Sequence, residues 1–412
     1  MERLPRIAAA ALCAAFLAGC GGAIEPTPKA LAPQGAATRV LREPLGPRSI
    51  VSGGRAAVTL CPATSDSSQA SCLGSARMMT SLTSAFPDSV DGLTPADLSS
   101  IYGYPAPGLQ PSNSPVVGVV VAYDNANAES DLSVYRSYFG LPACTSGNGC
   151  FQKVGAAAPS QSNSQSSDAK GKAVRFSVSA HPASTSGGWA AESDSDVEIV
   201  SAVCGNCQIV LAEAASNNIN DLAAAVNAAT GAGATVINAS FGANESPWQT
   251  NLESAFEPAP VKVVAAAGDS AGQVLFPADA TNVIAVAGTT LNVSGTTMSQ
   301  SLWQNSGGGC SRVFAAPPYQ PGWCTNRSIA DVAGIADPNT GLAFYDSGMG
   351  GWGIIGGTSV AAPVITAMLA MSGDAVAGSG AQPLYRNPGQ YMQVGGAGTI
   401  AGLGLPIALA AF

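Results

Sequence analysis

The chain has 412 residues, which is enough for one large domain or two ordinary ones with a sizeable buried core. Only 10% of the residues are charged and the net charge is -9, so the chain lacks the basic surface that nucleic-acid binding requires. A chain with few Lys and Arg residues also gains little positive charge when its carboxylates protonate, which favours tolerance of acid.

The first 20 residues predict an export signal. Arg3 and Arg6 precede an apolar run at 7–18 that ends in small residues. The ending Leu-Ala-Gly-Cys resembles a bacterial lipobox, in which Cys20 carries the lipid; an ordinary signal peptide with an incidental cysteine is the alternative. No later segment has the about 20 apolar residues of a membrane-spanning helix. We therefore expect an exported protein, lipid-anchored to the bacterial cell envelope at the periplasmic or outer-membrane face or at the cell surface.

Eight further cysteines follow Cys20 in four close pairs. In an exported protein these pairs predict four local disulfides. A zinc or redox site is the alternative for the Cys-Gly-Asn-Cys stretch at 204–207, although no second stretch of that kind and no histidine cluster accompanies it. The candidate disulfides are Cys61–Cys72, Cys144–Cys150, Cys204–Cys207 and Cys310–Cys324.

The composition divides the rest of the chain into three parts. Residues 21–57 are rich in Pro, Ala, Gly and Arg without a sustained period, which predicts a flexible tether. Residues 58–112 form a short N-terminal segment, with a helix start at Thr94 (cap) and Pro95 (first position). Residues 113–412 form the main domain.

Strand and helix signals alternate along the main domain. The first strand is the continuous apolar run 116–121, and Ser359 opens the last clear helix. This alternation predicts an α/β domain with a parallel sheet and functional groups at strand ends. Between these two elements we expect helices at 130–139, 189–203 and 219–229, strands at 209–211, 235–238, 261–266 and 283–287, and a Ser/Gln-rich loop at 159–170.

Ser359 follows Gly-Gly-Thr at a helix start, which is a plausible position for a nucleophile, but a serine needs a base. The order Asp124, His181, Ser359 imitates the subtilisin order. However, the only histidine lies in a loop-like stretch of Pro, Ser and Thr, and Asp124 is equally explained as a turn residue. This histidine triad remains an alternative, and it predicts that His181→Ala abolishes activity.

Carboxylates on one helix offer another base. Glu192 and Asp196 are four residues apart on the helix predicted at 189–203, so they share a face, and Val200 and Val203 continue it. Burial beside apolar residues raises a carboxyl pKa, and two carboxyls that share a proton can act as an acid/base unit. The plainer alternative is a set of solvated acids that suits the dipole at a helix N-terminus.

Together with the stretch Gly-Thr-Ser-Val-Ala-Ala-Pro at 357–363, Glu192 and Asp196 resemble the sedolisin (serine-carboxyl peptidase) family. This resemblance implies a subtilisin-like α/β fold, with a mostly parallel β-sheet and helices on both faces. It extends in order from about Leu93 to Pro406 and includes 131–142, 189–214, 240–242, 266–270, 276–278, 286–290 and 402–406.

The resemblance also implies roles for single residues. Ser359 is the expected nucleophile, Glu192 its general base and acid, and Asp196 the residue that orients Glu192 and holds the shared proton. Asp269, if protonated, donates to the oxyanion together with the backbone N–H of Ser359. The expected activity is an endopeptidase that acts on proteins or peptides in acidic medium, as a monomer without a cofactor. Ser240 and Gly242 are the expected substrate-binding residues.

Two features depart from the family pattern. Sedolisins carry a calcium site near the C-terminus, but Asp374 is the last acidic residue here, so we expect that site to be lost and predict no metal. A large prodomain does not fit between Cys20 and Val116; either none exists or residues 61–104 are a remnant. A catalytically inactive sedolisin-like lipoprotein that binds peptides or partners is therefore the alternative function.

Four other side chains are left open by the sequence. Asp194, in the spacer between the two candidate acids, could compete for the proton, although at i+2 it should point away from Glu192. Trp303, Trp323 and Trp352 either line a cleft or pack in the core.

Overall fold

The structure is a computed structural model that describes residues 37–41, 44–46, 49, 56–79, 84–106, 110, 115–155, 187–373, 380–395 and 400–412. The predicted signal peptide with Cys20, the Ser/Gln-rich loop, His181 and Asp374 lie outside the described residues. Across the described ranges, no helix is long and apolar enough to cross a membrane.

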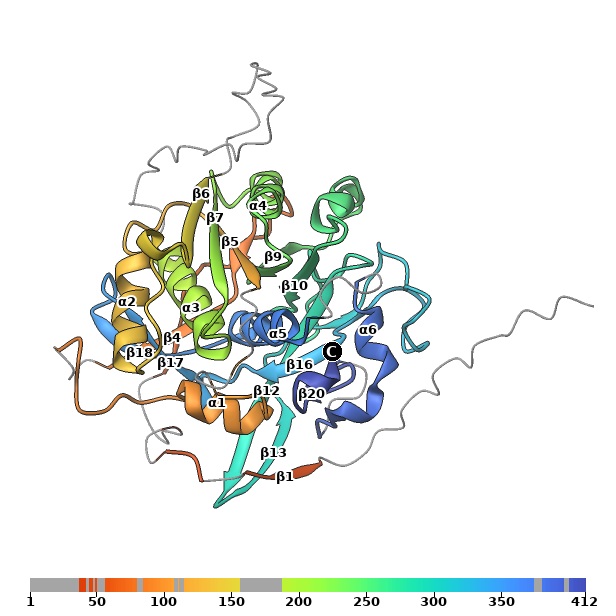
Figure 1. The fold of residues 1–412 in the computed structure, drawn as a ribbon. Coiled ribbons are helices and arrows are strands. Elements are labelled where there is room, and N and C mark those ends of the chain that lie inside the picture. The colour runs from red at the N-terminus through yellow and green to blue at the C-terminus, as the bar shows by residue number, and fades with distance from the viewer. Residues whose placement is uncertain are drawn as a thin grey trace, which may run out of the picture.

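The core of the molecule is a nine-stranded sheet with a parallel centre (Figure 1). Its order is β1-β13-β12-β10-β8-β5-β7-β6, with β16 paired to β12. All pairs from β12 to β6 and the β12–β16 pair are parallel, whereas β13 and β1 extend one edge antiparallel. The strands are β1 (Thr38–Val40), β5 (Val116–Ala122), β6 (Phe151–Gly155), β7 (Gln208–Ala214), β8 (Val236–Ala239), β10 (Lys262–Ala266), β12 (Ile284–Ser294), β13 (Thr297–Leu302) and β16 (Val332–Ile335).

Helices cover both faces of this sheet. Adjacent residues of β8 show this, because neighbouring side chains in a strand point to opposite faces. Thr366 of α5 donates to Asn238, whereas Ile237 packs over Gly118 beside Ala229 of α4. Helix α3 packs against α5. The helices are α1 (Pro95–Tyr102), α2 (Ala128–Tyr138), α3 (Gly187–Val203), α4 (Ile219–Gly231), α5 (Thr358–Ser372) and α6 (Gln382–Arg386).

The observed elements follow the sequence signals closely, and the predicted fold class is confirmed. Thr94 caps α1 by accepting from the backbone N–H of Asp97, as its position before Pro95 predicts. Helix α3 begins slightly earlier than predicted, and the short α6 follows the helix that Ser359 was expected to open as the last one. Short 3-10 helices are η2 (Ser146–Asn148), η5 (Pro247–Phe256), η6 (Pro338–Thr340), η8 (Pro388–Gln390) and η9 (Leu409–Ala411).

Smaller sheets join the N-terminal segment to the main domain. One is antiparallel in the order β17-β18-β4-β2, and another has the order β11-β9-β3. Two further antiparallel pairs are β14–β15 and β19–β20. These strands are β2 (Val58–Thr59), β3 (Ser71–Cys72), β4 (Ser75–Met78), β9 (Phe241–Asn244), β11 (Leu275–Phe276), β14 (Gly309–Cys310), β15 (Ser328–Ile329), β17 (Leu342–Asp346), β18 (Gly351–Gly356), β19 (Tyr391–Met392) and β20 (Leu405–Pro406).

Four disulfides are present in the described part of the chain. They join the pairs that the sequence suggests, and each closes a short loop of the chain. The Cys204–Cys207 bond leaves no thiolate for zinc at that position. The Cys61–Cys72 bond ends at β3, beside the candidate site described below.

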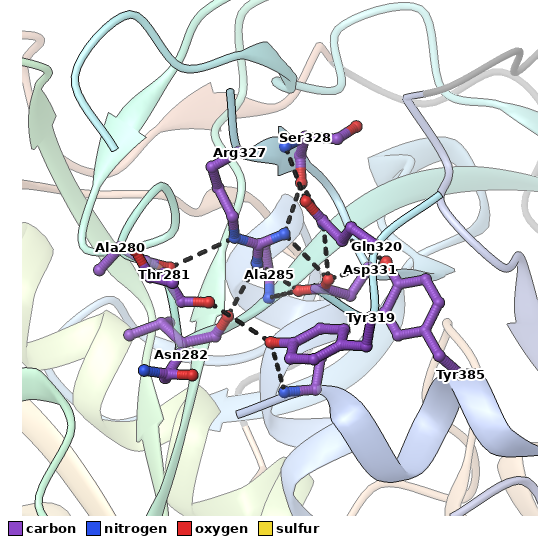
Figure 2. A network of polar contacts seen from close by, with 12 residues as sticks. Ala280, Thr281, Asn282, Ala285, Tyr319, Gln320, Arg327, Ser328, Asp331 and Tyr385 are labelled. Carbon is purple, nitrogen blue, oxygen red and sulfur yellow. Dashed lines mark hydrogen bonds and ion pairs between the residues drawn. The ribbon is translucent and has the colours of Figure 1, made fainter. Parts of the chain in front are cut away.

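A buried ion pair fixes the start of β12 (Figure 2). Arg327 and Asp331 are both fully buried, and Nη1 of Arg327 lies 2.9 Å from Oδ1 of Asp331. Asp331 accepts the backbone N–H of Ala285 in β12 and the hydroxyl of Tyr385 in α6, while Arg327 donates to the carbonyl of Val283. This network therefore connects the central sheet to the C-terminal part of the fold.

Candidate active site

Two helices bring the predicted nucleophile and acids together. Helix α5 starts at Thr358, so Ser359 lies in its first turn, and α3 packs against it with Glu192 and Asp196. All three side chains are at most 1% exposed. Gly357 has φ +120, and a side chain there would collide with the carbonyl oxygen of Leu73 at 2.2 Å, so this turn requires glycine.

Helix α3 is buried on all sides, not only along one stripe. Its four acids, Glu192, Asp194, Asp196 and Glu198, are each at most 1% exposed. Acids that only complemented a helix dipole would lie in solvent, so the structure contradicts that alternative. Asp194 points away from Glu192, as its spacing predicts, and accepts from Asn125 at 2.7 Å.

Glu192 and Asp196 form a coupled acidic pair. Burial raises the pKa of Glu192 well above its ordinary value, and the charge of Asp196 raises it further. Both oxygens of Glu192, Oδ2 of Asp196 and Oγ of Ser359 are buried, and the Ser359 hydroxyl acts on Glu192 by lowering its pKa against the effect of burial. The pair therefore retains a proton to higher pH than free carboxyls do, and its reactive atoms are not committed to structural contacts.

Two residues support Asp196: Ser240, which the sequence analysis assigned to substrate binding, and Asn238, which it did not single out. Oγ of Ser240 donates to Oδ1 of Asp196 at 2.7 Å, and Nδ2 of Asn238 donates to Oγ of Ser240 at 2.8 Å. These contacts oppose the burial that raises the pKa of Asp196. Asn238 is fully buried in β8, and a buried amide in an otherwise apolar strand is the signal that could have identified it.

Asp269 follows β10 and faces the start of α5. Its Oδ1 accepts the backbone N–H and the hydroxyl of Thr358, both at 2.8 Å. Burial of the carboxyl group raises the pKa of Asp269 to about 7, against the effect of the two Thr358 hydrogen bonds. Because Oδ1 is occupied by donors, the proton belongs on Oδ2, which lies on the Gly357 side of the site.

A segment of the same chain lies across these groups. Ser71 and Cys72 of β3 pair antiparallel with Gly242 and Phe241 of β9. The backbone N–H of Leu73 donates to the carbonyl of Ser240, and that of Ser359 donates to the carbonyl of Leu73, both at 3.2 Å. The two residues that the resemblance assigned to substrate binding, Ser240 and Gly242, thus contact an extended peptide through their backbone.

The three tryptophans and Asp124, which the sequence left open, lie in different kinds of surroundings. Trp303 lines a cleft of about 800 Å³ beside the segment, together with Asp269 and Gly242. Trp352 is buried among aromatic rings of α2 and β17, and Trp323 is half-buried against the core. Asp124 forms an ion pair with Lys153 at 2.6 Å.

An acidic cluster lies behind α3, away from Ser359. It consists of Asp131, Asp194 and Asp346, whose carboxylate oxygens lie within 4.8 Å of one another. Burial raises the pKa of Asp194, and the charges of Asp346 and Asp131 raise it further.

The chain is similar in sequence to the subtilase family and to kumamolisin, and in structure to sedolisin. The model of the subtilase family matches residues 153–378, more than half of the chain. Kumamolisin from Bacillus sp. (strain MN-32) is 31% identical over 215 residues, and the match covers 43% of this chain and 38% of kumamolisin, so the chain spans under half of that relative's length. The structure of Pseudomonas sedolisin, a serine-carboxyl proteinase complexed with two molecules of pseudo-iodotyrostatin, matches with a TM-score of 0.58 and 20% identity, over 77% of this chain and 96% of sedolisin.

Proposed function

The chain belongs to the subtilase family, and from that membership we propose that it is a serine-carboxyl endopeptidase of the sedolisin type. One observation carries this proposal. The buried Glu192–Asp196 pair, Ser359 and Asp269 converge on one extended peptide, whose Leu73 carbonyl accepts the N–H of the nucleophile. Glutamate thus takes the place that histidine has in other serine peptidases.

The side chains supply each step of peptide hydrolysis. Oγ of Ser359 attacks the substrate carbonyl carbon while its proton passes to Glu192, and Asp196 accommodates the proton that the pair already shares. The backbone N–H of Ser359 and the protonated carboxyl of Asp269 stabilise the oxyanion. Glu192 then protonates the leaving amine, and water releases the acyl group by the same route in reverse.

The proposed chemistry operates in acid. Asp269 carries its proton, and therefore a hydrogen-bond donor, only below its pKa of about 7. The Glu192–Asp196 pair must hold one proton and one charge, and its raised pKa values keep that state available above the usual carboxyl range. We therefore expect activity to fall as the pH rises above 7.

Digestion of a denatured protein between pH 3 and 8 tests the proposal. The full chain should cleave it, while Ser359→Ala and Glu192→Gln should each lose at least about 10³-fold in rate. His181→Ala should retain full activity and serves as the matched control for the histidine triad. Equal rates for the wild type and Ser359→Ala at every pH would instead favour the inactive, peptide-binding alternative.

We also propose that the enzyme is an exported monomer, anchored to the cell envelope by a lipid on Cys20 and acting on proteins or peptides. The four disulfides agree with an exported protein. Cys20→Ser should abolish incorporation of labelled fatty acid and release the protein from membranes. Unchanged membrane retention of this variant would argue for an ordinary signal peptide.

A further inference from the structure

We propose that Thr358 is a positioning residue, whose hydroxyl group keeps the proton of Asp269 on the oxygen that faces the substrate. The inference rests on the proposed peptidase function and assigns a role to the residue before the nucleophile. Thr358 is fully buried at the first position of α5, so water does not compete for its hydroxyl group.

The hydroxyl group of Thr358 lies between a donor and an acceptor. The backbone N–H of Gly268 donates to Oγ1 of Thr358 at 3.0 Å, and Oγ1 in turn donates to Oδ1 of Asp269 at 2.8 Å. A hydroxyl group has a single proton, and the N–H of Gly268 can only donate. At the first position of a helix there is also no preceding turn whose carbonyl oxygen could accept that proton. The hydroxyl proton of Thr358 therefore points to Asp269.

The methyl group of Thr358 supports the same orientation. A Cβ on Gly288 would lie 3.3 Å from Cγ2 of Thr358, so this methyl group packs close to the backbone of β12. Because a threonine side chain is restricted at its first torsion angle, packing of the methyl group also fixes the direction of the hydroxyl group. The donor on the other side is held as well, since the carbonyl of Gly268 accepts the N–H of Gly307 at 2.6 Å.

Two hydrogen bonds then converge on one oxygen of Asp269. The backbone N–H of Thr358 donates to Oδ1 at 2.8 Å, in addition to the hydroxyl group. An oxygen that accepts two donors is a poor site for the carboxyl proton, so the proton lies on Oδ2. A Cβ on Gly357 would lie 2.7 Å from Oδ2 and 2.2 Å from the carbonyl oxygen of Leu73, so Oδ2 and that carbonyl flank the same point. The Leu73 carbonyl also accepts the N–H of Ser359 at 3.2 Å and thus marks the place of a substrate carbonyl.

The same hydroxyl group affects the pH at which Asp269 loses its proton. Burial raises the pKa of Asp269 and the two Thr358 hydrogen bonds lower it, with a result of about 7. Loss of the hydroxyl group should therefore raise this pKa, because a hydrogen bond to the charged form disappears.

Two other acids face this part of the site. One is Glu192 of α3, whose pKa is raised by burial, by the charge of Asp196 and, less strongly, by that of Asp269. The other is Asp337, which lines the same cleft as Asp269. Among the residues that the structure describes, no Lys or Arg lines this cleft. A test of Thr358 must therefore separate the titration of Asp269 from that of Glu192.

Thr358→Ala and Thr358→Ser isolate the contribution of the hydroxyl group. Both variants lack the methyl group and only the serine keeps the hydroxyl group, so Thr358→Ser is the matched control. The measurements are kcat/KM on a denatured protein between pH 4 and 9 and Tm, which reports folding. At pH 5 we expect Thr358→Ala to lose about tenfold, less than the roughly 10²–10³-fold of a missing oxyanion donor, because its proton is no longer confined to Oδ2.

The pH profile distinguishes this role from a purely structural one. In Thr358→Ala the pH at which kcat/KM falls to half on the alkaline side should rise by about one unit, which corresponds to one hydrogen bond to a charged group. Thr358→Ser should keep the wild-type value. A structural role alone would lower the rate at every pH without moving this midpoint.

An unmoved midpoint in a folded Thr358→Ala chain, or an equal shift in Thr358→Ser, overturns the proposal. If Thr358→Ala does not fold, Thr358→Val, which also lacks the hydroxyl group, takes its place with the same expected shift. In an Asp269→Asn background, Thr358→Ala should produce no shift, and a shift that persists there belongs to Glu192 and also overturns the proposal. Absence of any Ser359-dependent cleavage by the wild type would instead refute the proposed function, and this inference with it.

Discussion

Replacing Asp269 by asparagine should convert a titrating oxyanion donor into a permanent one. Oδ1 of Asp269 accepts two hydrogen bonds from Thr358, so a wild-type proton belongs on Oδ2. In Asp269→Asn the amide oxygen can keep the contacts of Oδ1, and the NH2 group then lies where Oδ2 was. The variant therefore retains the donor at every pH.

The expected size of the effect follows from the pKa of about 7. One pH unit above that value only about a tenth of the wild-type molecules keep the Asp269 proton, and two units above only about a hundredth. The wild-type rate should thus fall about tenfold per pH unit beyond pH 7, whereas Asp269→Asn should stay level. Asp269→Ala should lose about 10²–10³-fold at acidic pH, since one oxyanion donor is missing there too.

The appropriate measurement is kcat/KM on a denatured protein between pH 4 and 9, obtained from initial rates, with Ser359→Ala as the background. If the rate of Asp269→Asn fell above pH 7 as steeply as the wild-type rate, the reasoning would be refuted, because another group would then control the fall. Equal rates for Asp269→Ala and the wild type at pH 5 would remove Asp269 from the site altogether.

Four further predictions concern pH, stability and metal. Ser240→Ala removes the 2.7 Å hydrogen bond that lowers the pKa of Asp196, so the acidic limb of kcat/KM should move to higher pH. Because burial raises the pKa of Asp194, the folded state binds a proton there more tightly than the unfolded state does. The stability that this proton contributes is present below about pH 4 and is lost as the pH rises through the folded pKa. The Tm of Asp194→Asn should therefore depend less on pH above pH 4 than the Tm of the wild type. Arg327→Met leaves Asp331 buried and unpaired and should lower the free energy of unfolding by about 3–5 kcal/mol in urea titrations. Because the C-terminal segment has no acidic residues after Asp374, EDTA should leave Tm unchanged.

The three predictions on stability and metal each have a clear contrary result. The exposed Asp88→Asn is the control for Asp194, and equal effects of the two substitutions would contradict a role for burial. A Tm that EDTA lowers and calcium restores, but not in Asp194→Asn, would show that the acidic cluster of Asp131, Asp194 and Asp346 holds a cation. Unchanged stability of Arg327→Met would show that the buried pair contributes nothing.

The sequence by itself determined the order and type of the main elements. Continuous apolar runs mark β5 and β10 because a parallel sheet is buried on both faces. The spacing of Glu192 and Asp196 places both on one face of α3, since residues four apart in a helix are neighbours. The four cysteine pairs were also apparent, because they are close along the chain.

Only the tertiary structure decided which residues surround and contact the active-site side chains. The burial of all four acids of α3 depends on the helices and strands around it, and the support of Asp196 by Ser240 and Asn238 depends on where β8 ends beside α3. The contact between Leu73 and Ser359 joins residues 286 positions apart (359 minus 73). Local propensity and periodicity extend over a few turns or strand residues, whereas pairing across such a separation depends on the register of β3 and β4 against β9 and β18. For that physical reason the occupied active site is a property of the fold, although each of its residues is visible in the sequence.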